Sequence, residues 1–466
     1  MDIFSSFENQ WTITGIIRLA SAFRIGGGQN AAAYSLSASP VIQSYNAEKN
    51  MYLPVILGSS LKGVLRTGVE RLVRSFKIEE SCVALTSDRD VKRLCGNCVT
   101  CGLFGSMKRG SKICVDDAQI PAGDIKTVYD PATVHEQPHY ASSSSGPAQR
   151  GRREGLLRSE ETVAAGTRFE FRIRLDNATK TEAGLILLAL QEFNEKRLQI
   201  GGAVSRGLGF IDVIDLKVEK ASVGESGKIS SMTANVKNLK QKAKEYLTNI
   251  DAKKDSGLND FSVYAFAHER ISPGTGQKNG HTVARFTVIT RLPFKMAGFD
   301  ESTVTNYHEP YIPGSTIKGF LRHRFAAEYE DKNAGAQQFS GGKGMPHSPP
   351  RPSRTDEIFG DTRNHRSRIL VSDAFSMKKV TANDEIPINT ILQMWMVFDN
   401  MQGSDIDKIL NLIKEPVVIT GSKSAGIDRR ARRFKPTHNL VEFTLDPKDV
   451  TIFRTDTYLI ECDPSN

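Results

Sequence analysis

The sequence lacks the features that mark membrane proteins, secreted proteins and several common enzyme classes. No apolar run approaches the roughly 20 residues that a membrane-spanning helix needs. The first residues, MDIFSSFENQW, lack the basic-then-apolar pattern of a signal peptide, so we expect a cytoplasmic protein. The chain also lacks a nucleophile elbow, a zincin motif, a dinucleotide fingerprint and a Walker loop. These absences argue against the corresponding hydrolases and nucleotide-binding enzymes.

Length and charge set broad limits on the fold and on the partner. The chain has 466 residues, of which 39% are hydrophobic, and at about 100–200 residues per domain it predicts two to four domains. Lysine and arginine total 62 against 53 for aspartate and glutamate, which gives a net charge of +9. A moderate basic excess is compatible with a polyanionic partner such as nucleic acid, although many basic proteins bind none.

Several motifs occur twice, in the same order. VILGSSLKGVLR (55–66) recurs as YIPGSTIKGFLR (311–322), and ICVDDA (113–118) recurs as ILVSDA (369–374), which aligns Asp117 with Asp373. IGGAVSRG (200–207) likewise resembles ITGSKSAG (419–426). Each unit is interpreted as strand, helix, strands, helix, strand, the order of a ferredoxin-like α+β unit. An aspartate that ends a strand is more often a turn or cap residue than a catalyst, so Asp117 and Asp373 are weak catalytic candidates.

The repeat predicts the domain organisation. The first unit spans 1–217 and carries two insertions, at 76–103 and 122–160, and the second unit spans 280–466. Residues 218–279 join the units: SVGESGKISSM has a linker-like composition, and apolar residues at helical spacing follow it between 236 and 250. We favour a helix packed on a domain surface over a partner-binding helix.

The repeated GSSLKG and GSTIKG segments place a small turn at a helix start, where free backbone N–H groups favour an anion. Lys62 and Arg66 are four residues apart, as are Lys318 and Arg322, so each pair lies on one helix face. Two cations above such a turn suit a phosphodiester backbone, and the alternative is a solvated basic face. The loop GSKSAGIDRRARRFK of the second copy is the densest cationic cluster in the chain.

Four of the six cysteines crowd together as Cys82, Cys95, Cys98 and Cys101. In a reducing compartment such clustering favours metal over disulfides. Four thiolates complete a tetrahedral zinc site and leave no open position for water, so we interpret it as structural zinc rather than catalytic zinc. A redox role for Cys95 and Cys98 is the weaker alternative.

Together these residues resemble the RAMP superfamily of CRISPR proteins, in particular the repeating backbone subunit of type III effector complexes. The matching pieces are the first strand with its following glycines, the GSSLKGVLR helix start, the LFG and VDDA segments, and GGAVSRGLG. Two such units in one chain resemble the fused backbone subunits of some type III variants. The resemblance implies two tandem RRM-like domains, and partners that are guide RNA, target RNA and other effector subunits.

The resemblance also implies which residues contact RNA. The insertion at 122–160 corresponds in position and basic content to a hairpin "thumb" that crosses the guide–target duplex, and the cysteine cluster corresponds to a zinc insertion. In the first copy we expect RNA contacts from Gly26, Gly27, Gly28, Ser59, Ser60, Lys62, Arg66, Arg150, Arg152, Arg153, Arg158 and Arg206. In the second copy we expect them from Ser315, Thr316, Lys318, Arg322, Lys423, Arg429 and Arg430.

Nuclease-active members of this family carry an aspartate between the first strand and the helix, which cuts target RNA with Mg²⁺ or another divalent metal. The first copy has Ala38 at that position, and residues 3–87 contain no aspartate, so we expect this copy to be inactive. In the second copy Asp300 is the candidate catalytic residue. Two alternatives stay open: a scaffold without catalysis, and a metal-independent guide-processing endonuclease that would use His139 and Tyr140.

Overall fold

The protein is described by a computed structural model. It covers residues 6–26, 40–47, 50–76, 81–82, 94–122, 132–140, 155–163, 165–204, 207–223, 228–251, 280–294, 305–306, 309–329, 353–360, 367–376, 385–419 and 438–453.

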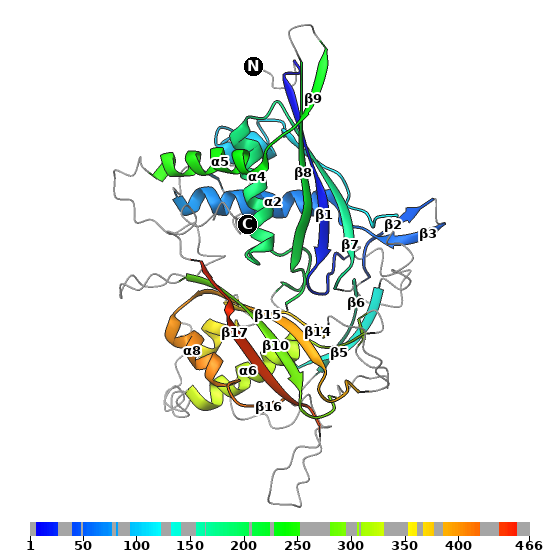
Figure 1. The fold of residues 1–466 in the computed structure, drawn as a ribbon, viewed down its shortest axis with the longest axis vertical. Coiled ribbons are helices and arrows are strands. Elements are labelled where there is room, and N and C mark those ends of the chain that lie inside the picture. Colours follow the sequence, from blue (N-terminus) through cyan, green and yellow to red (C-terminus); the bar gives the residue numbers. More distant parts are fainter. Residues whose placement is uncertain are drawn as a thin grey trace, which may run out of the picture.

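The first copy is built on a five-stranded antiparallel sheet (Figure 1). Its strand order is β4 (Ile113–Val115), β7 (Arg168–Asp176), β1 (Asn9–Leu19), β8 (Ile211–Val223) and β9 (Ile229–Thr233). In β1 the buried residues Trp11 and Ile13 are separated by the less buried Thr12, as expected for a strand that turns one face toward the core. The apolar spacing in β1 thus fixes which face of the sheet is covered.

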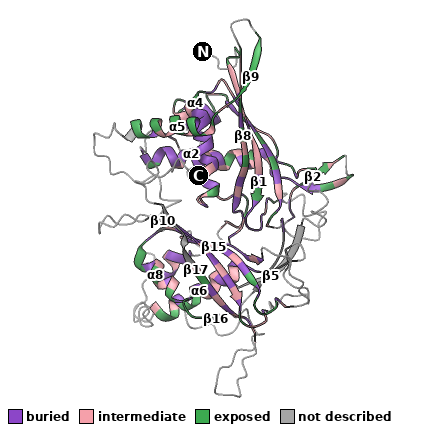
Figure 2. Ribbon diagram, viewed as in Figure 1, coloured by how far each residue is buried: buried purple, intermediate pink, exposed green. Residues whose placement is uncertain are grey.

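Three long helices complete the first core: α2 (Gly58–Phe76), α4 (Lys180–Asn194) and α5 (Val236–Asp251). Helix α4 is coloured as buried over most of its length in Figure 2 because it contacts α2, α5 and β8. A capping box starts it: Thr179 accepts from the Glu182 amide, and the Glu182 carboxylate accepts from the Thr179 amide. Lys112 Nζ donates to both Glu182 carboxylate oxygens at 2.9 Å, so this buried charge is paired.

The second copy repeats this architecture on a larger sheet. Its strand order is β11 (Thr305–Asn306), β12 (Glu309–Ile312), β14 (Ala374–Ser376), β15 (Ile391–Met401), β10 (Gly280–Thr290), β17 (Leu440–Phe453) and β16 (Val417–Val418), and β13 (Ile369–Val371) also pairs with β15. Its helices are α6 (Gly314–Tyr329), α7 (Arg354–Phe359) and α8 (Gly403–Asn411). A separate apolar core runs through this sheet and its helices.

The duplication extends to single backbone hydrogen bonds. Strand, helix, strand, strand, helix, strand occur as β1, α2, β4, β7, α4 and β8 in the first copy, and as β10, α6, β13, β15, α8 and β17 in the second. The bond from the Phe23 amide to the Val163 carbonyl is repeated from Phe294 to Ile386. The predicted α+β class and the internal repeat are both confirmed.

Several small elements of the first copy lie outside its sheet. A hairpin of β2 (Gln43–Asn46) and β3 (Met51–Pro54) precedes α2. The strands β5 (Ala132–Tyr140) and β6 (Gly155–Val163) pair with each other and lie almost entirely within the predicted thumb insertion. The short helix α3 (Val99–Phe104) begins inside the cysteine segment.

The start of the predicted linker differs from the expectation. Residues 211–223 form β8, which pairs with the central strand β1, and 229–233 form β9, which pairs with β8. The helix at 236–251 packs on α4, and its Leu239, Ala243 and Leu247 belong to the first core. The first folded unit therefore extends past 217 to about residue 251 because these segments find partners in its sheet and on its helix.

A small apolar cluster joins the two copies. Ala20 and Phe210 of the first copy pack with Val283, Leu370 and Val397 of the second. Next to it, Lys196 Nζ lies 5.3 Å from the centroid of the Trp395 ring. A side chain at Gly207, which has φ of 86°, would come within 1.7 Å of the Val371 carbonyl oxygen. The glycine-rich segment of the first copy thus packs directly on β13 of the second.

Candidate zinc centre and RNA-binding surface

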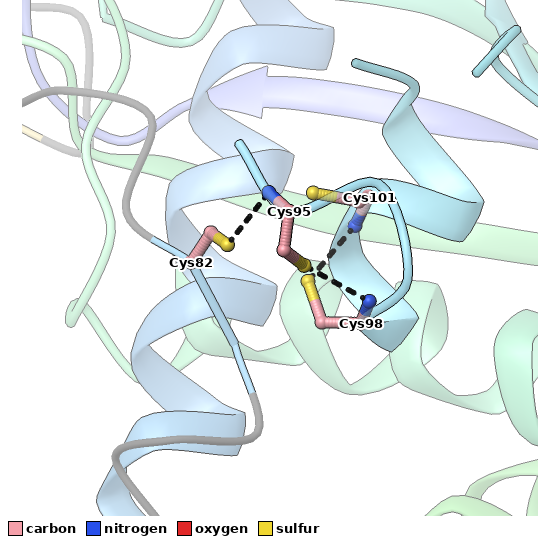
Figure 3. A group of neighbouring side chains, drawn as sticks. All are labelled: Cys82, Cys95, Cys98 and Cys101. Atoms are coloured by element: carbon pink, nitrogen blue, oxygen red, sulfur yellow. Dashed lines mark hydrogen bonds between the residues drawn. The ribbon is translucent and has the colours of Figure 1, made fainter. Parts of the chain in front are cut away.

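The four predicted metal ligands converge at one point. The sulfur atoms of Cys82, Cys95, Cys98 and Cys101 all lie within 4.8 Å of one another (Figure 3). Cys82 follows α2, Cys95 and Cys98 lie in the turn before α3, and Cys101 is in α3 and buried. Four thiols at this spacing fit a tetrahedral ion such as zinc, and they would fill all four of its coordination positions. Zinc bound there would cross-link the end of α2 to α3.

Backbone amides also point at these sulfur atoms, as in a pre-formed thiolate site. The Cys95 amide donates to Cys82 Sγ at 3.3 Å, and the Cys98 amide donates to Cys95 Sγ at 3.2 Å. Gly96, with φ of 81°, makes the tight turn that allows the second of these bonds. Burial tends to raise the pKa of Cys95, but the amides of Cys98 and Asn97 outweigh it and lower the pKa to about 6.

The cysteine segment replaces a cap that the second copy makes with serine. Cys98 is the N-cap of α3 and accepts from the Cys101 amide, while Ser353 is the N-cap of α7 and accepts from the Asp356 amide. Both helices end at a glycine with positive φ, Gly105 and Gly360. The candidate metal ligands are therefore an addition to a helix that both copies share.

The repeated helix-start motif contacts the repeated aspartate. The Gly58 amide donates to Asp117 Oδ1 at 2.7 Å, and the Gly314 amide donates to Asp373 Oδ1 at 2.8 Å. A side chain at Gly58 would lie 2.1 Å from the Val115 carbonyl oxygen, so only glycine fits. The two aspartates act as helix-start acceptors, which agrees with the interpretation that the sequence favoured.

The four cations of this motif lie along the same helices and contact protein groups. Lys62 Nζ donates to Ser111 Oγ and to the Ile113 carbonyl, and burial lowers its pKa. Arg66 donates to the Gly105 carbonyl and pairs with Glu70. In the second copy Arg322 donates to the Gly360 carbonyl and pairs with Asp356, and burial together with Arg322 lowers the pKa of Lys318 to about 7. These contacts give the motif a structural role, and phosphate binding by these cations stays a prediction.

The two glycine segments of the first copy lie against each other. The Gly202 amide donates to the Arg24 carbonyl at 2.7 Å, and a side chain at Gly201 would lie 2.2 Å from that same oxygen. Gly26, Gly201 and Gly202 are exposed. We call Arg24, Gly26, Gly201 and Gly202 the glycine surface: a patch on which three exposed glycines lie beside one arginine.

Only some of the remaining predicted site residues lie in the described part of the chain. Ser59 is exposed at the start of α2, Ser60 beside it is half-buried, and Ser315 and Thr316 are half-buried at the start of α6. Arg158 lies in β6. The catalytic candidate Asp300 lies outside the described residues, and so do Gly27, Gly28, Arg150, Arg152, Arg153, Arg206, Lys423, Arg429 and Arg430.

A comparison with protein-family models decides the family. The model of the RAMP superfamily matches residues 16–212 and 300–430. The chain belongs to the RAMP superfamily. Its two matched regions coincide with the two copies, as in a tandem RAMP protein of the type III CRISPR kind, and membership implies a CRISPR-associated RNA-binding subunit. No curated protein matches the chain. Among the helices of the described residues, none combines the length and apolar character that crossing a membrane requires.

Sequence reasoning missed one part of this RAMP protein's site. The two glycine segments are separate in the sequence, which does not predict that Gly201 and Gly202 contact the Arg24 carbonyl, two residues before Gly26. The order of the strands brings them together, because the loops after β1 and before β8 leave neighbouring strands at the same end of the sheet. Predicting the β1–β8 pair from the apolar patterns would have found it.

Proposed function

We propose that this RAMP protein is a double backbone subunit of a type III CRISPR effector complex, and that it holds guide RNA along the glycine surface. The observation that supports this is the contact of Gly201 and Gly202 with the Arg24 carbonyl, two residues before Gly26, on an exposed face. At a glycine, a sugar–phosphate backbone can approach the peptide backbone closely, because no side chain stands between them. Arg24, which lies at the edge of this surface, carries a cation that suits a phosphate.

Gly202→Asp tests this surface with little steric cost. The nearest atom to a side chain at Gly202 is the Arg24 carbonyl oxygen at 3.8 Å, which is ordinary contact. The new carboxylate would face the phosphates of bound RNA, and like charges in contact weaken binding strongly. We expect the Kd for guide RNA, measured by filter binding at fixed salt, to rise at least about tenfold.

Gly403→Asp is the matched control. Gly403 starts α8 in the second copy, and a side chain there meets nothing within 4 Å. An aspartate in a first helical turn is also favourable. Its RNA affinity should equal that of the wild type. Equal affinities for both variants would place the guide elsewhere on the protein.

We further propose that the second copy cuts target RNA at one site through Asp300, which rests on the family resemblance of the sequence. The divalent metal would be held at this carboxylate and would stabilise charge on the scissile phosphate. Asp300→Ala in the assembled complex should abolish one cleavage product and leave guide binding within about twofold of wild type. Product lengths on a labelled target strand measure the first effect.

Two results, one from this experiment and one from a second assay, separate the alternatives. Cleavage at every position in the Asp300→Ala complex would show that another residue or subunit is the catalyst, and the chain would be a scaffold. Specific cutting of precursor RNA by the isolated chain in excess chelator would favour a metal-independent guide-processing endonuclease instead.

A further inference from the structure

The β2–β3 hairpin carries an aromatic pair that neither core uses. Tyr45 and Tyr52 are direct cross-strand partners, and they are 52% and 64% exposed. In Figure 1 the hairpin projects away from the body of the first copy. Large aromatic rings are usually buried, so two of them held in solvent on a projecting hairpin indicate a binding function.

The two rings are held in position before any ligand arrives. Their centroids are 5.4 Å apart in an edge-to-face arrangement, which is a favourable geometry for an aromatic pair. The Tyr45 hydroxyl donates to Asn50 Oδ1 at 2.6 Å. Asn50 adopts a left-handed backbone with φ of 52° just before β3. A rigid ring loses little conformational entropy when a flat ligand stacks on it.

The hairpin is continuous with the glycine surface. The Ile42 amide donates to the Ile25 carbonyl at 2.9 Å, and Gly26 forms a bridge with Val41, immediately before β2 begins. The aromatic pair therefore lies on the same hairpin that joins the edge of the glycine surface, four residues beyond Val41. Unpaired nucleobases stack on exposed aromatic rings regardless of sequence, because every base has a flat π-face.

We propose that Tyr45 and Tyr52 form a stacking platform for an unpaired base of bound RNA. This inference rests on the proposed function, since it requires RNA on the adjoining glycine surface. The platform recognises the base, whereas the glycine surface recognises the sugar–phosphate backbone. The platform should not bind a duplex, because paired bases are already stacked on one another.

The test compares two RNA probes of equal length and charge. One is a single-stranded oligouridine, and the other has abasic sites in place of every base. Wild-type protein should bind the first more tightly by about tenfold or more per stacked base. In Tyr45→Ala/Tyr52→Ala this preference should disappear, because affinity for the oligouridine falls to that for the abasic strand.

Tyr45→Phe/Tyr52→Phe is the matched control, because it keeps both rings and removes only the hydroxyl groups. It should retain most of the base preference. Both rings are outside the core, so unchanged thermal unfolding should confirm that the alanine variant folds. An alanine variant that still prefers the base-containing strand overturns the stacking platform, whereas a wild type that binds neither probe overturns the proposed function itself.

Discussion

Replacing Cys98 with serine should remove the metal from the first copy without disturbing the helix that follows. Serine already caps the corresponding helix at Ser353, so the N-cap of α3 survives the change. The tetrahedral thiolate shell does not survive, because only Cys82, Cys95 and Cys101 remain. We expect zinc content to fall from one ion per chain to none, and the first copy to lose at least about 3 kcal/mol of unfolding free energy.

The measurement can isolate the first copy because each copy has one tryptophan. Trp11 lies in the first core, where its Nε1 donates to the Ala178 carbonyl, and Trp395 lies in β15. In a Trp395→Phe background, fluorescence follows the first copy alone during denaturant unfolding. Cys114→Ser is the control, since Cys114 is exposed and outside the cluster. Unchanged metal content in the Cys98→Ser protein would contradict the four-cysteine site.

The sequence could predict the cysteine cluster and the repeat because both depend on local spacing. Two successive C-x2-C steps bring three sulfur atoms together in almost any turn. Only Cys82 is distant from the other three cysteines in the sequence. The repeated glycine and aspartate could be aligned, but not their mutual hydrogen bond, which requires β4 to lie beside the start of α2. Helical spacing correctly predicted that Lys62 and Arg66 lie on one face of the helix. It could not predict that they donate there to the carbonyl groups of residues 113 and 105.

The predicted linker shows the limit of reasoning from composition. Residues 218–223 and 229–233 are polar and glycine-poor enough to form strands, but their apolar pattern is weak, and β9 is exposed throughout. They form strands because β8 pairs with the edge of β1, and β9 then pairs with the edge of β8. Pairing supplied by the rest of the sheet overrode a linker-like composition.

The second copy should lose stability as the pH rises from about 4 to about 7. Complete burial outweighs the Gly314 hydrogen bond and raises the pKa of Asp373 from 3.8 to about 7. The folded state therefore holds a proton that the unfolded state has released, so stability is full below the unfolded pKa and is lost toward the folded one. The full shift corresponds to at most about 4 kcal/mol. Urea unfolding of a Trp11→Phe protein, followed by Trp395 fluorescence across this range, measures it.

Asp373→Asn should remove this loss of stability between about pH 4 and 7. The asparagine amide oxygen still accepts from the Gly314 amide, but the side chain does not titrate.

Lys318 should make stability change with pH in the opposite direction. Its pKa is lowered by burial from 10.5 to about 7, so the unfolded state binds the extra proton and stability rises again between about pH 7 and 10.5. Lys318→Met should remove that rise alone. The wild-type second copy is then least stable near pH 7, and a stability maximum there would contradict both assignments at once.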